Sequence, residues 1–221
     1  ILRRLSEGDR AFLREEYSDV VTMFWDAVEA CPEKLALIEG DRKLSYEQYG
    51  SAVAGLAARI GEIVPPSGRV AISIPNSIEA NVAIFAALSA GAEISMVNAE
   101  YTPRELGVLF GIAEPDLVLA GGQNATVAGA TAGSIGKPLA IVGEGGIAIE
   151  QLLETPPERP GLEITGESPC IIMFTGGSTG APKGVRRSQS SEMSCIKAMQ
   201  TAWPTRLYEE VWLNVAPVSH V

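Results

Sequence analysis

The residues best suited to chemistry in this chain lie in one stretch, residues 174–185, which reads FTGGSTGAPKGV. Its glycines let the backbone approach a ligand closely and allow positive φ, where successive N–H groups can converge. Hydroxyls and a lysine add further donors, so the stretch predicts a loop that binds an anion, and an oligophosphate better than a neutral ligand. The alternative is a surface turn between two strands. The candidate ligand-binding residues are Thr175, Gly176, Gly177, Ser178, Thr179, Gly180 and Lys183.

Spacing excludes two known phosphate-binding motifs from this stretch. A Walker A loop needs a glycine before its lysine and a serine or threonine after it, whereas Lys183 stands between Pro182 and Gly184. A dinucleotide fingerprint, G-x-G-x-x-G, has a different glycine interval and opens a helix, which Pro182 and Gly184 oppose. The loop therefore belongs to neither of these classes.

A third motif, the nucleophile elbow G-x-S-x-G of serine hydrolases, does match by letters, with Ser178 in the nucleophile position. Its expected partners would be His220 and either Glu209 or Glu210, which follow in the required order. An elbow turns directly into a helix, but here the chain continues through APKGV. A serine hydrolase thus stays open as an alternative in an unfavourable local context.

The elements around the loop alternate between strands and helices. Serine or threonine stands three residues before Gln48 and before Glu105, which predicts two helices that begin with capping boxes, and Ser77 predicts a third helix start. Short apolar runs predict strands over 70–74, 94–97, 116–120, 139–142, 170–174 and 211–215, with 185–188 pairing back after the loop and a helix over 190–203. Residues 121–136 have no clear form. The regular alternation predicts a mostly parallel sheet flanked by helices on both faces.

Composition excludes several other protein classes. The chain has 221 residues, 46% of them hydrophobic, so it can bury a substantial core. A net charge of −10 disfavours a nucleic-acid or membrane-surface protein, and the apolar run 82–88 is too short to span a bilayer. Three widely spaced cysteines predict reduced thiols and a cytoplasmic protein, and a single histidine argues against a transition-metal site.

The loop sequence also resembles the signature motif of a specific family. FTGGSTGAPKGV is similar to the signature Y/F-T-S/G-G-T/S-T-G-x-P-K-G-V of the adenylate-forming superfamily, the AMP-binding enzymes that include acyl-CoA synthetases, luciferases and peptide-synthetase adenylation domains. Further stretches resemble family segments in the same order, over about residues 20–221. These stretches are LSYEQ (44–48), RVAISIPNS (69–77), VNAEYTPREL (97–106) and APVSH (216–220).

The resemblance implies the fold and the reaction. Residues 1–168 would form the first α/β subdomain of the AMP-binding N-terminal domain, and 169–221 a strand, the phosphate loop and the start of the second subdomain. The implied activity is ATP- and Mg²⁺-dependent activation of a carboxylic acid, of the fatty or aromatic acid-CoA ligase type. An acyl-adenylate forms first, and coenzyme A is the expected acceptor of the acyl group. Fatty acid metabolism is the implied setting, and the implied partner is a small-molecule acid, without nucleic acid.

The resemblance also implies roles for individual residues. The loop residues from Thr175 to Gly180, with Lys183, would grip the pyrophosphate end of ATP, and His220 would border the acyl pocket, although a purely structural role for this histidine is the alternative. No residue here is implied as a direct metal ligand. The family's catalytic lysine belongs to a C-terminal domain beyond Val221, so the chain is expected to be an N-terminal part, inactive alone and prone to self-association.

Other expectations concern residues near the loop and the aromatic side chains. Arg186 and Arg187 are predicted to be a solvated pair beyond a strand, with contact to a phosphate as the alternative. A histidine found in many relatives shortly after PKGV is replaced here by SQS (188–190). The tryptophans, which are Trp25, Trp203 and Trp212, are expected in the core or at its rim. A non-catalytic binding module of the same fold is the second alternative function.

Overall fold

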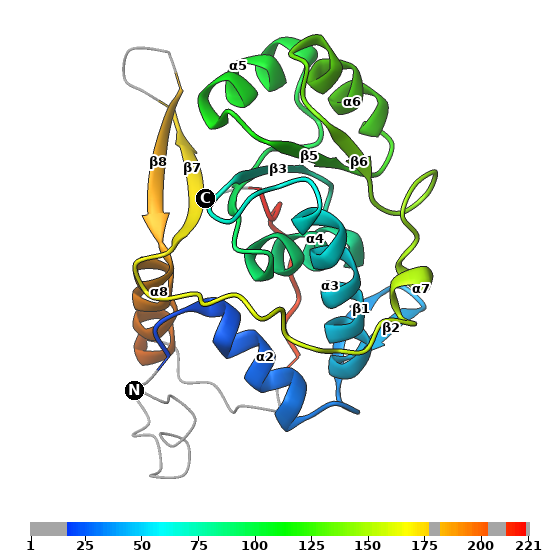
Figure 1. The fold of residues 1–221 in the computed structure, drawn as a ribbon, viewed down its shortest axis with the longest axis vertical. Helices are drawn as coiled ribbons and strands as arrows, with labels where there is room; N and C mark the ends of the chain where they lie inside the picture. The colour runs from blue at the N-terminus through cyan, green and yellow to red at the C-terminus, as the bar shows by residue number, and fades with distance from the viewer. Residues whose placement is uncertain (1–16, 177–181, 203–210, 220–221) are drawn as a thin grey trace.

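A computed structural model describes residues 17–176, 182–202 and 211–219 of the chain. Its centre is a six-stranded sheet in the order β6-β5-β3-β4-β7-β8, with a separate hairpin of β1 and β2 (Figure 1). The strands are β1 Leu35–Glu39, β2 Arg42–Ser45, β3 Arg69–Ser73, β4 Glu93–Met96, β5 Leu117–Ala120, β6 Leu139–Ile141, β7 Pro169–Thr175 and β8 Lys183–Ser188. The mixed α/β fold predicted from the sequence is confirmed.

The sheet is parallel from β6 to β7, and only β8 runs antiparallel, paired with β7. Every residue of β4 and β5 is buried, as expected of strands covered on both faces. The predicted return of the chain after the loop is confirmed, because β8 pairs with β7 up to the partners Thr175 and Lys183. The loop therefore joins two hydrogen-bonded strands, and its two ends lie side by side.

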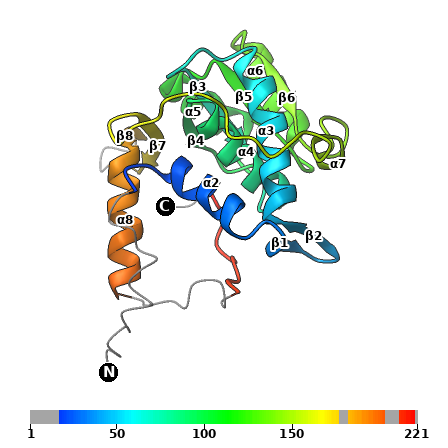
Figure 2. The same cartoon turned by 60° about the horizontal axis from the view of Figure 1, so that its bottom comes forward.

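Helices cover both faces of the sheet (Figure 1). Ile72 of β3 packs in the core shared with α2, α3 and α4, while Ala71 next to it belongs to the core under α5 and α6. Figure 2 shows α8 running away from the hairpin at one end of the molecule. The helices are α2 Val20–Ala30, α3 Tyr46–Gly61, α4 Ile78–Ser89, α5 Pro103–Ala113, α6 Ala125–Ser134, α7 Ile149–Leu152 and α8 Gln189–Ala202.

The predicted helix starts are confirmed in atomic detail. Ser45 and Gln48 form a complete capping box at α3, and Thr102 and Glu105 form another at α5. Ser77 accepts a hydrogen bond from the backbone N–H of Ala80 and so caps α4. Because each cap satisfies N–H groups that the helix itself leaves free, the sequence fixes where these helices begin.

The structure settles the form of one segment that the sequence left open and corrects the prediction for another. The glycine- and alanine-rich stretch 121–136 contains α6. The predicted strand over 211–215 is wrong: these residues are described, form no strand, and expose apolar side chains such as Val211 and Leu213. Alternating residues define an apolar face, but a strand also needs a neighbouring strand to bond, and the described part of the chain provides none there.

The tryptophans fall in different environments. Trp25 is buried in the core and donates a hydrogen bond to Ser89, and neighbouring Phe24 stacks on Phe85. Trp212 is 64% exposed, so it lies at the surface rather than in the core. Trp203 lies outside the described residues.

Candidate functional site

The predicted phosphate loop leaves β7 and enters β8, and the structure describes both of its ends. Thr175 is the last residue of β7, Gly176 follows it, and Lys183 is the first residue of β8, paired with Thr175. Five other predicted site residues lie outside the described residues: Gly177, Ser178, Thr179, Gly180 and His220. The structure thus brings together three of the predicted residues at one end of the hairpin.

These three residues are available to a ligand. Thr175, Gly176 and Lys183 are all exposed. A Cβ built on Gly176 would meet no atom within 4 Å, so space is open on that side of the backbone. Among the described residues, Lys183 takes part in no ion pair. An exposed ammonium group beside a hydroxyl and a glycine is a suitable rim for an anion.

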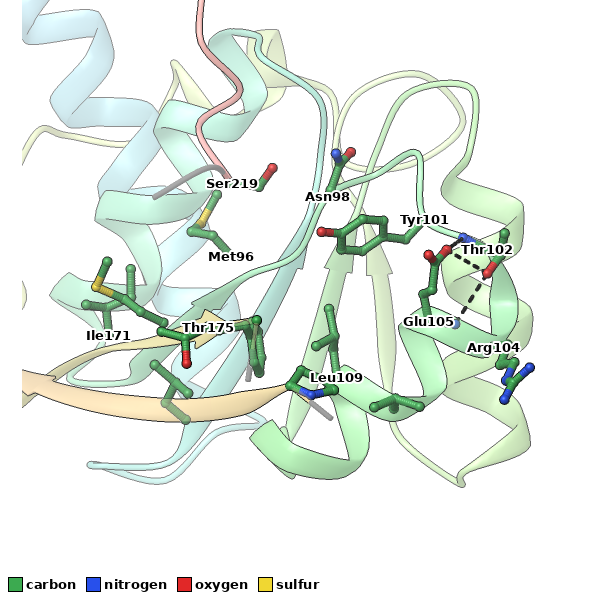
Figure 3. Close-up of a pocket in the computed structure, with 16 residues that line it drawn as sticks. Met96, Asn98, Tyr101, Thr102, Arg104, Glu105, Leu109, Ile171, Thr175 and Ser219 are labelled. Atoms are coloured by element: carbon green, nitrogen blue, oxygen red, sulfur yellow. Dashed lines mark hydrogen bonds between the residues drawn. The ribbon is translucent and has the colours of Figure 1, made fainter. Parts of the chain in front are cut away.

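A cleft of about 690 Å³ lies directly beside these loop ends (Figure 3). It runs between α5 and the β7–β8 hairpin, at the carboxyl end of β4. In open α/β sheets, ligands bind outside the carboxyl ends of strands, where successive connections go to opposite faces. Here α4 and α5, the connections before and after β4, do lie on opposite faces of the sheet. The cleft therefore occupies the usual ligand position of this architecture.

The lining of the cleft divides into an apolar part and a polar part. Aliphatic and aromatic side chains line much of it, namely Met96, Val108, Leu109, Ile171, Ile172, Met173 and Phe174. Polar side chains also line it, namely Asn98, Tyr101, Thr102, Arg104, Glu105, Thr175 and Ser219. Figure 3 shows the Tyr101 hydroxyl directed toward the interior of the cleft and the Arg104 guanidinium turned away from it. The cleft consequently offers apolar side chains together with hydrogen-bonding groups, and its charged residues, Arg104 and Glu105, come from α5.

The wall contributed by α5 is fixed by its capping box. The Thr102 hydroxyl donates to Glu105 Oε2 at 2.7 Å, and the Thr102 backbone N–H donates to the same oxygen at 2.8 Å. These two hydrogen bonds lower the pKa of Glu105 from its ordinary value. Because this carboxylate is already engaged by the cap, we assign it to the structure of the wall rather than to ligand binding.

Ser219 reaches the cleft through an unusual anchor at the turn after β3. The Asn76 side chain donates from Nδ2 to the Ala216 carbonyl at 2.7 Å and accepts at Oδ1 from the Val218 N–H at 2.7 Å. Asn76 thereby pairs with the segment as another backbone would. His220, the predicted pocket residue, follows Ser219 directly in the sequence and lies outside the described residues.

The prediction for Arg186 and Arg187 is corrected in part: the Arg186 side chain is 57% exposed, but both arginines have protein partners. Both lie within β8 and form ion pairs on opposite sides of the hairpin. Arg186 Nε donates to Glu93 Oε1 at 2.8 Å, and this hydrogen bond raises the pKa of Arg186. Arg187 Nε lies 2.9 Å from Glu192 Oε1 of α8. The sequence could not show this, because Glu93 is far away along the chain.

Sequence reasoning also missed residues that line or support the cleft. Asn98 and Tyr101 belong to the stretch 97–106, which resembles a family segment, but the sequence alone assigns them no role in a site. A polar cluster directly after a buried strand is a usual indication of a ligand site. Glu93 could have been noticed as an acidic residue at the start of a short, mostly apolar strand. Buried carboxylates are rare unless they are paired.

Within residues 17–176, 182–202 and 211–219, no group of three or more His, Cys, Asp or Glu side chains is placed to hold a metal ion. None of the helices described there is both long and apolar enough to cross a membrane. The cysteines, which are Cys31, Cys170 and Cys195, are all described and all free.

Two solved structures share the fold of this chain. ATP-bound MatB from Rhodopseudomonas palustris superimposes with a TM-score of 0.72 at 22% identity, covering 84% of this chain and 38% of that one. The N-terminal domain of FACL13 from Mycobacterium tuberculosis gives a TM-score of 0.73 at 22% identity, covering 85% and 48%. These likenesses establish the fold.

The sequence relatives include both a synthase and a CoA ligase. Syringomycin synthase SyrB1 of Pseudomonas syringae pv. syringae is 27% identical over 91% of this chain and 30% of its own length. The long-chain-fatty-acid–CoA ligase FadD13 of Mycobacterium tuberculosis is 26% identical over 82% of this chain and 36% of its own length. The chain thus spans about a third of each of these two relatives. The family model for AMP-binding enzymes matches residues 24–221, so the chain belongs to the AMP-binding enzyme family.

Proposed function

We propose that this chain supplies the phosphate-binding part of an enzyme that activates a carboxylic acid with ATP and then transfers the acyl group to a thiol. One observation carries the proposal: in a chain of the AMP-binding family, Thr175 and Gly176 line a cleft with many apolar side chains, and Lys183 is the strand partner of Thr175. This arrangement places donors for an anion next to a surface that suits an uncharged tail.

The proposed first step forms an acyl-adenylate. A carboxylate oxygen of the acid attacks the α-phosphorus of ATP, a new O–P bond forms, and the bond to the β-phosphate bridging oxygen breaks, so that pyrophosphate leaves with its electrons. The Thr175 hydroxyl, the backbone N–H groups from Gly176 to Gly180 and the Lys183 ammonium would hold this departing group. Mg²⁺, when bound with ATP, would neutralise part of its charge.

The acid would occupy the cleft between α5 and the hairpin. Its volume of about 690 Å³ lies within the usual range of about 300–1,000 Å³ for small-molecule sites. Side chains such as Leu109, Ile172 and Phe174 favour an aliphatic or aromatic tail. Ser219, and His220 after it, would border the acid near its carboxylate.

Coenzyme A is the acceptor that we propose for the second step. The names of two relatives support it, since FadD13 of Mycobacterium tuberculosis and CCL5 of Humulus lupulus are both called CoA ligases. The peptide synthetases among the relatives favour a carrier-protein thiol instead. Incubating the complete protein with ATP, acid and either acceptor, and identifying the thioester by mass spectrometry, distinguishes the two. The free cysteines are consistent with a cytoplasmic enzyme.

The test of the proposal is acid-dependent exchange of labelled pyrophosphate into ATP by the complete protein, over a panel of aliphatic and aromatic acids. We expect Lys183→Ala to lower the exchange rate by about 10²–10³-fold, as loss of one charge-stabilising donor does in other enzymes. Lys43→Ala is the matched control, because Lys43 is exposed on β2 in the separate two-stranded hairpin.

Unchanged exchange in the Lys183→Ala protein would contradict the assigned role. Two other outcomes would replace the function itself. Labelling of Ser178 by a fluorophosphonate, without exchange for any acid, would favour a serine hydrolase. Lack of both exchange and a thermal shift with Mg·ATP would favour a non-catalytic module.

A further inference from the structure

The strand that carries Lys183 lies at the edge of the sheet. In the described part of the chain, β8 has only β7 as a strand neighbour, and four of its six residues are exposed. Edge strands are held by fewer hydrogen bonds than central ones and shift more easily. A loop that must hold a phosphate group at fixed distances therefore needs β8 to be held by something besides its ladder to β7.

A buried carboxylate provides such an attachment. The Glu93 side chain, at the start of β4, has no exposed surface. Its Oε1 lies 2.8 Å from Arg186 Nε of β8, and its Oε2 lies 3.4 Å from Arg69 Nε of β3. Arg69 also forms an ion pair with Glu114, which directly follows α5, with 3.1 Å between Arg69 Nη1 and Glu114 Oε2. Cations and anions thus alternate across the sheet face that α5 covers.

The contact between Arg186 and Glu93 reaches across the intervening strand β7. In the sheet, β7 lies between β4 and β8, so the Arg186 guanidinium passes over β7 to reach Glu93. Arg186 pairs with Ile172 in the ladder, and only Gly184 and Val185 separate it from Lys183. The ion pair therefore links the loop-bearing edge strand directly to the centre of the sheet.

A charge buried in this way does not tolerate the loss of its partner. Removal of Arg186 would leave Glu93 with Arg69 alone, at 3.4 Å, a distance longer than that of a strong charge-assisted hydrogen bond. The carboxylate would then draw in water or a new partner, and β8 would lose this attachment to β4. The resulting freedom would be greatest at the loop end of the strand.

We propose that Glu93 and Arg186 are positioning residues that, through β8, set Lys183 for the phosphates of ATP. The inference rests on the proposed function, because it assigns the loop to the phosphates of ATP. Neither residue needs to touch the nucleotide. The pair acts through β8, which it holds so that Lys183 stays opposite Thr175.

The test compares two neighbouring arginines of β8 in the complete protein. Arg186→Gln removes the contact to Glu93, whereas Arg187→Gln removes an ion pair of the same strand that faces α8. We expect Arg186→Gln to raise the KM for ATP and the dissociation constant of Mg·ATP about tenfold, with little change in the KM for the acid. We expect Arg187→Gln to leave all three values near those of the wild type.

Conservative variants separate positioning from simple loss of folding. Arg186→Lys should restore part of the affinity for ATP, because an ammonium group can still pair with Glu93. Glu93→Gln, which keeps an oxygen that can accept from Arg186, should have an effect smaller than Arg186→Gln. Circular dichroism of each variant shows whether the fold is retained.

The outcomes distinguish this inference from the proposed function. An unchanged Mg·ATP dissociation constant in folded Arg186→Gln protein, or an equal change in Arg187→Gln, would overturn the positioning role. Lack of exchange for every acid in the wild type would instead count against the proposed function, while the binding measurements would still test the pair.

Discussion

Replacing Gly184 by alanine probes how closely β8 packs against α5. A Cβ at this position would lie 2.9 Å from Ile112 Cγ2 and 3.1 Å from Ile172 Cγ2. Both distances are shorter than ordinary carbon contacts of about 3.5–4.0 Å. Ile112 cannot simply swing its methyl group away, because β-branched side chains in helices have one strongly preferred χ1 rotamer. The substitution therefore forces the strand and the helix apart.

The size of the effect follows from two opposing contributions. Overpacking a well-filled contact costs about 1–3 kcal/mol of folding free energy. Alanine in place of glycine inside a strand returns about 0.5–1 kcal/mol, because the unfolded chain loses less conformational freedom. Because these two contributions partly cancel, we expect a net destabilisation of about 1 kcal/mol.

Urea unfolding of wild type and variant, followed by tryptophan fluorescence, measures this difference at the transition midpoint. Gly133→Ala is the matched control, because Gly133 lies in α6 and a Cβ there would meet no atom within 4 Å. We expect this control to gain about 0.5–1 kcal/mol, as alanine does over glycine in helices. If Gly184→Ala gains stability like the control, the close packing of β8 on α5 is refuted.

Two further predictions concern titratable groups. Burial alone would raise the pKa of Glu79, but the hydrogen bond from Arg42 at 2.6 Å lowers this pKa below its ordinary value. The charged carboxylate therefore stabilises the fold at neutral pH, and this stabilisation is lost as the pH falls through the lowered pKa. Glu79→Gln should thus melt below the wild type near neutral pH, with a gap that closes in acid; a constant gap would contradict this. Burial raises the pKa of the Cys170 thiol to about 12. Iodoacetamide at about pH 8 should therefore label the exposed Cys195 and leave Cys170 unlabelled until urea unfolds the protein. Peptide mass spectrometry measures the labelling of each cysteine. Prompt labelling of Cys170 in the native protein would contradict its burial.

Local features of the fold were predictable from the sequence wherever neighbouring residues decide them. The capping boxes of α3 and α5 each lie within four residues, so Ser45 with Gln48 and Thr102 with Glu105 marked the helix starts. The loop between β7 and β8 was predictable for the same reason, since its glycines and its flanking apolar run are adjacent.

Features that depend on distant partners were not predictable in this way. Arg186 finds Glu93 across β7, and residues far apart in the sequence carry no local pattern that links them. The alternation in residues 211–215 indicated a strand, but strand formation depends on a neighbour that a periodic pattern cannot supply. The cleft was missed likewise, because its walls come from β4, α5 and the hairpin, which only the folded topology brings together.

The contact of Asn76 with residues 216–218 has a consequence for register. A strand pair spreads its alignment over many hydrogen bonds, so one lost bond leaves the register intact. Here a single amide group supplies both a donor and an acceptor, and a slip of one residue would break the two bonds together. The alignment of this segment, and with it the place of Ser219 at the cleft, is thus determined by one side chain, Asn76.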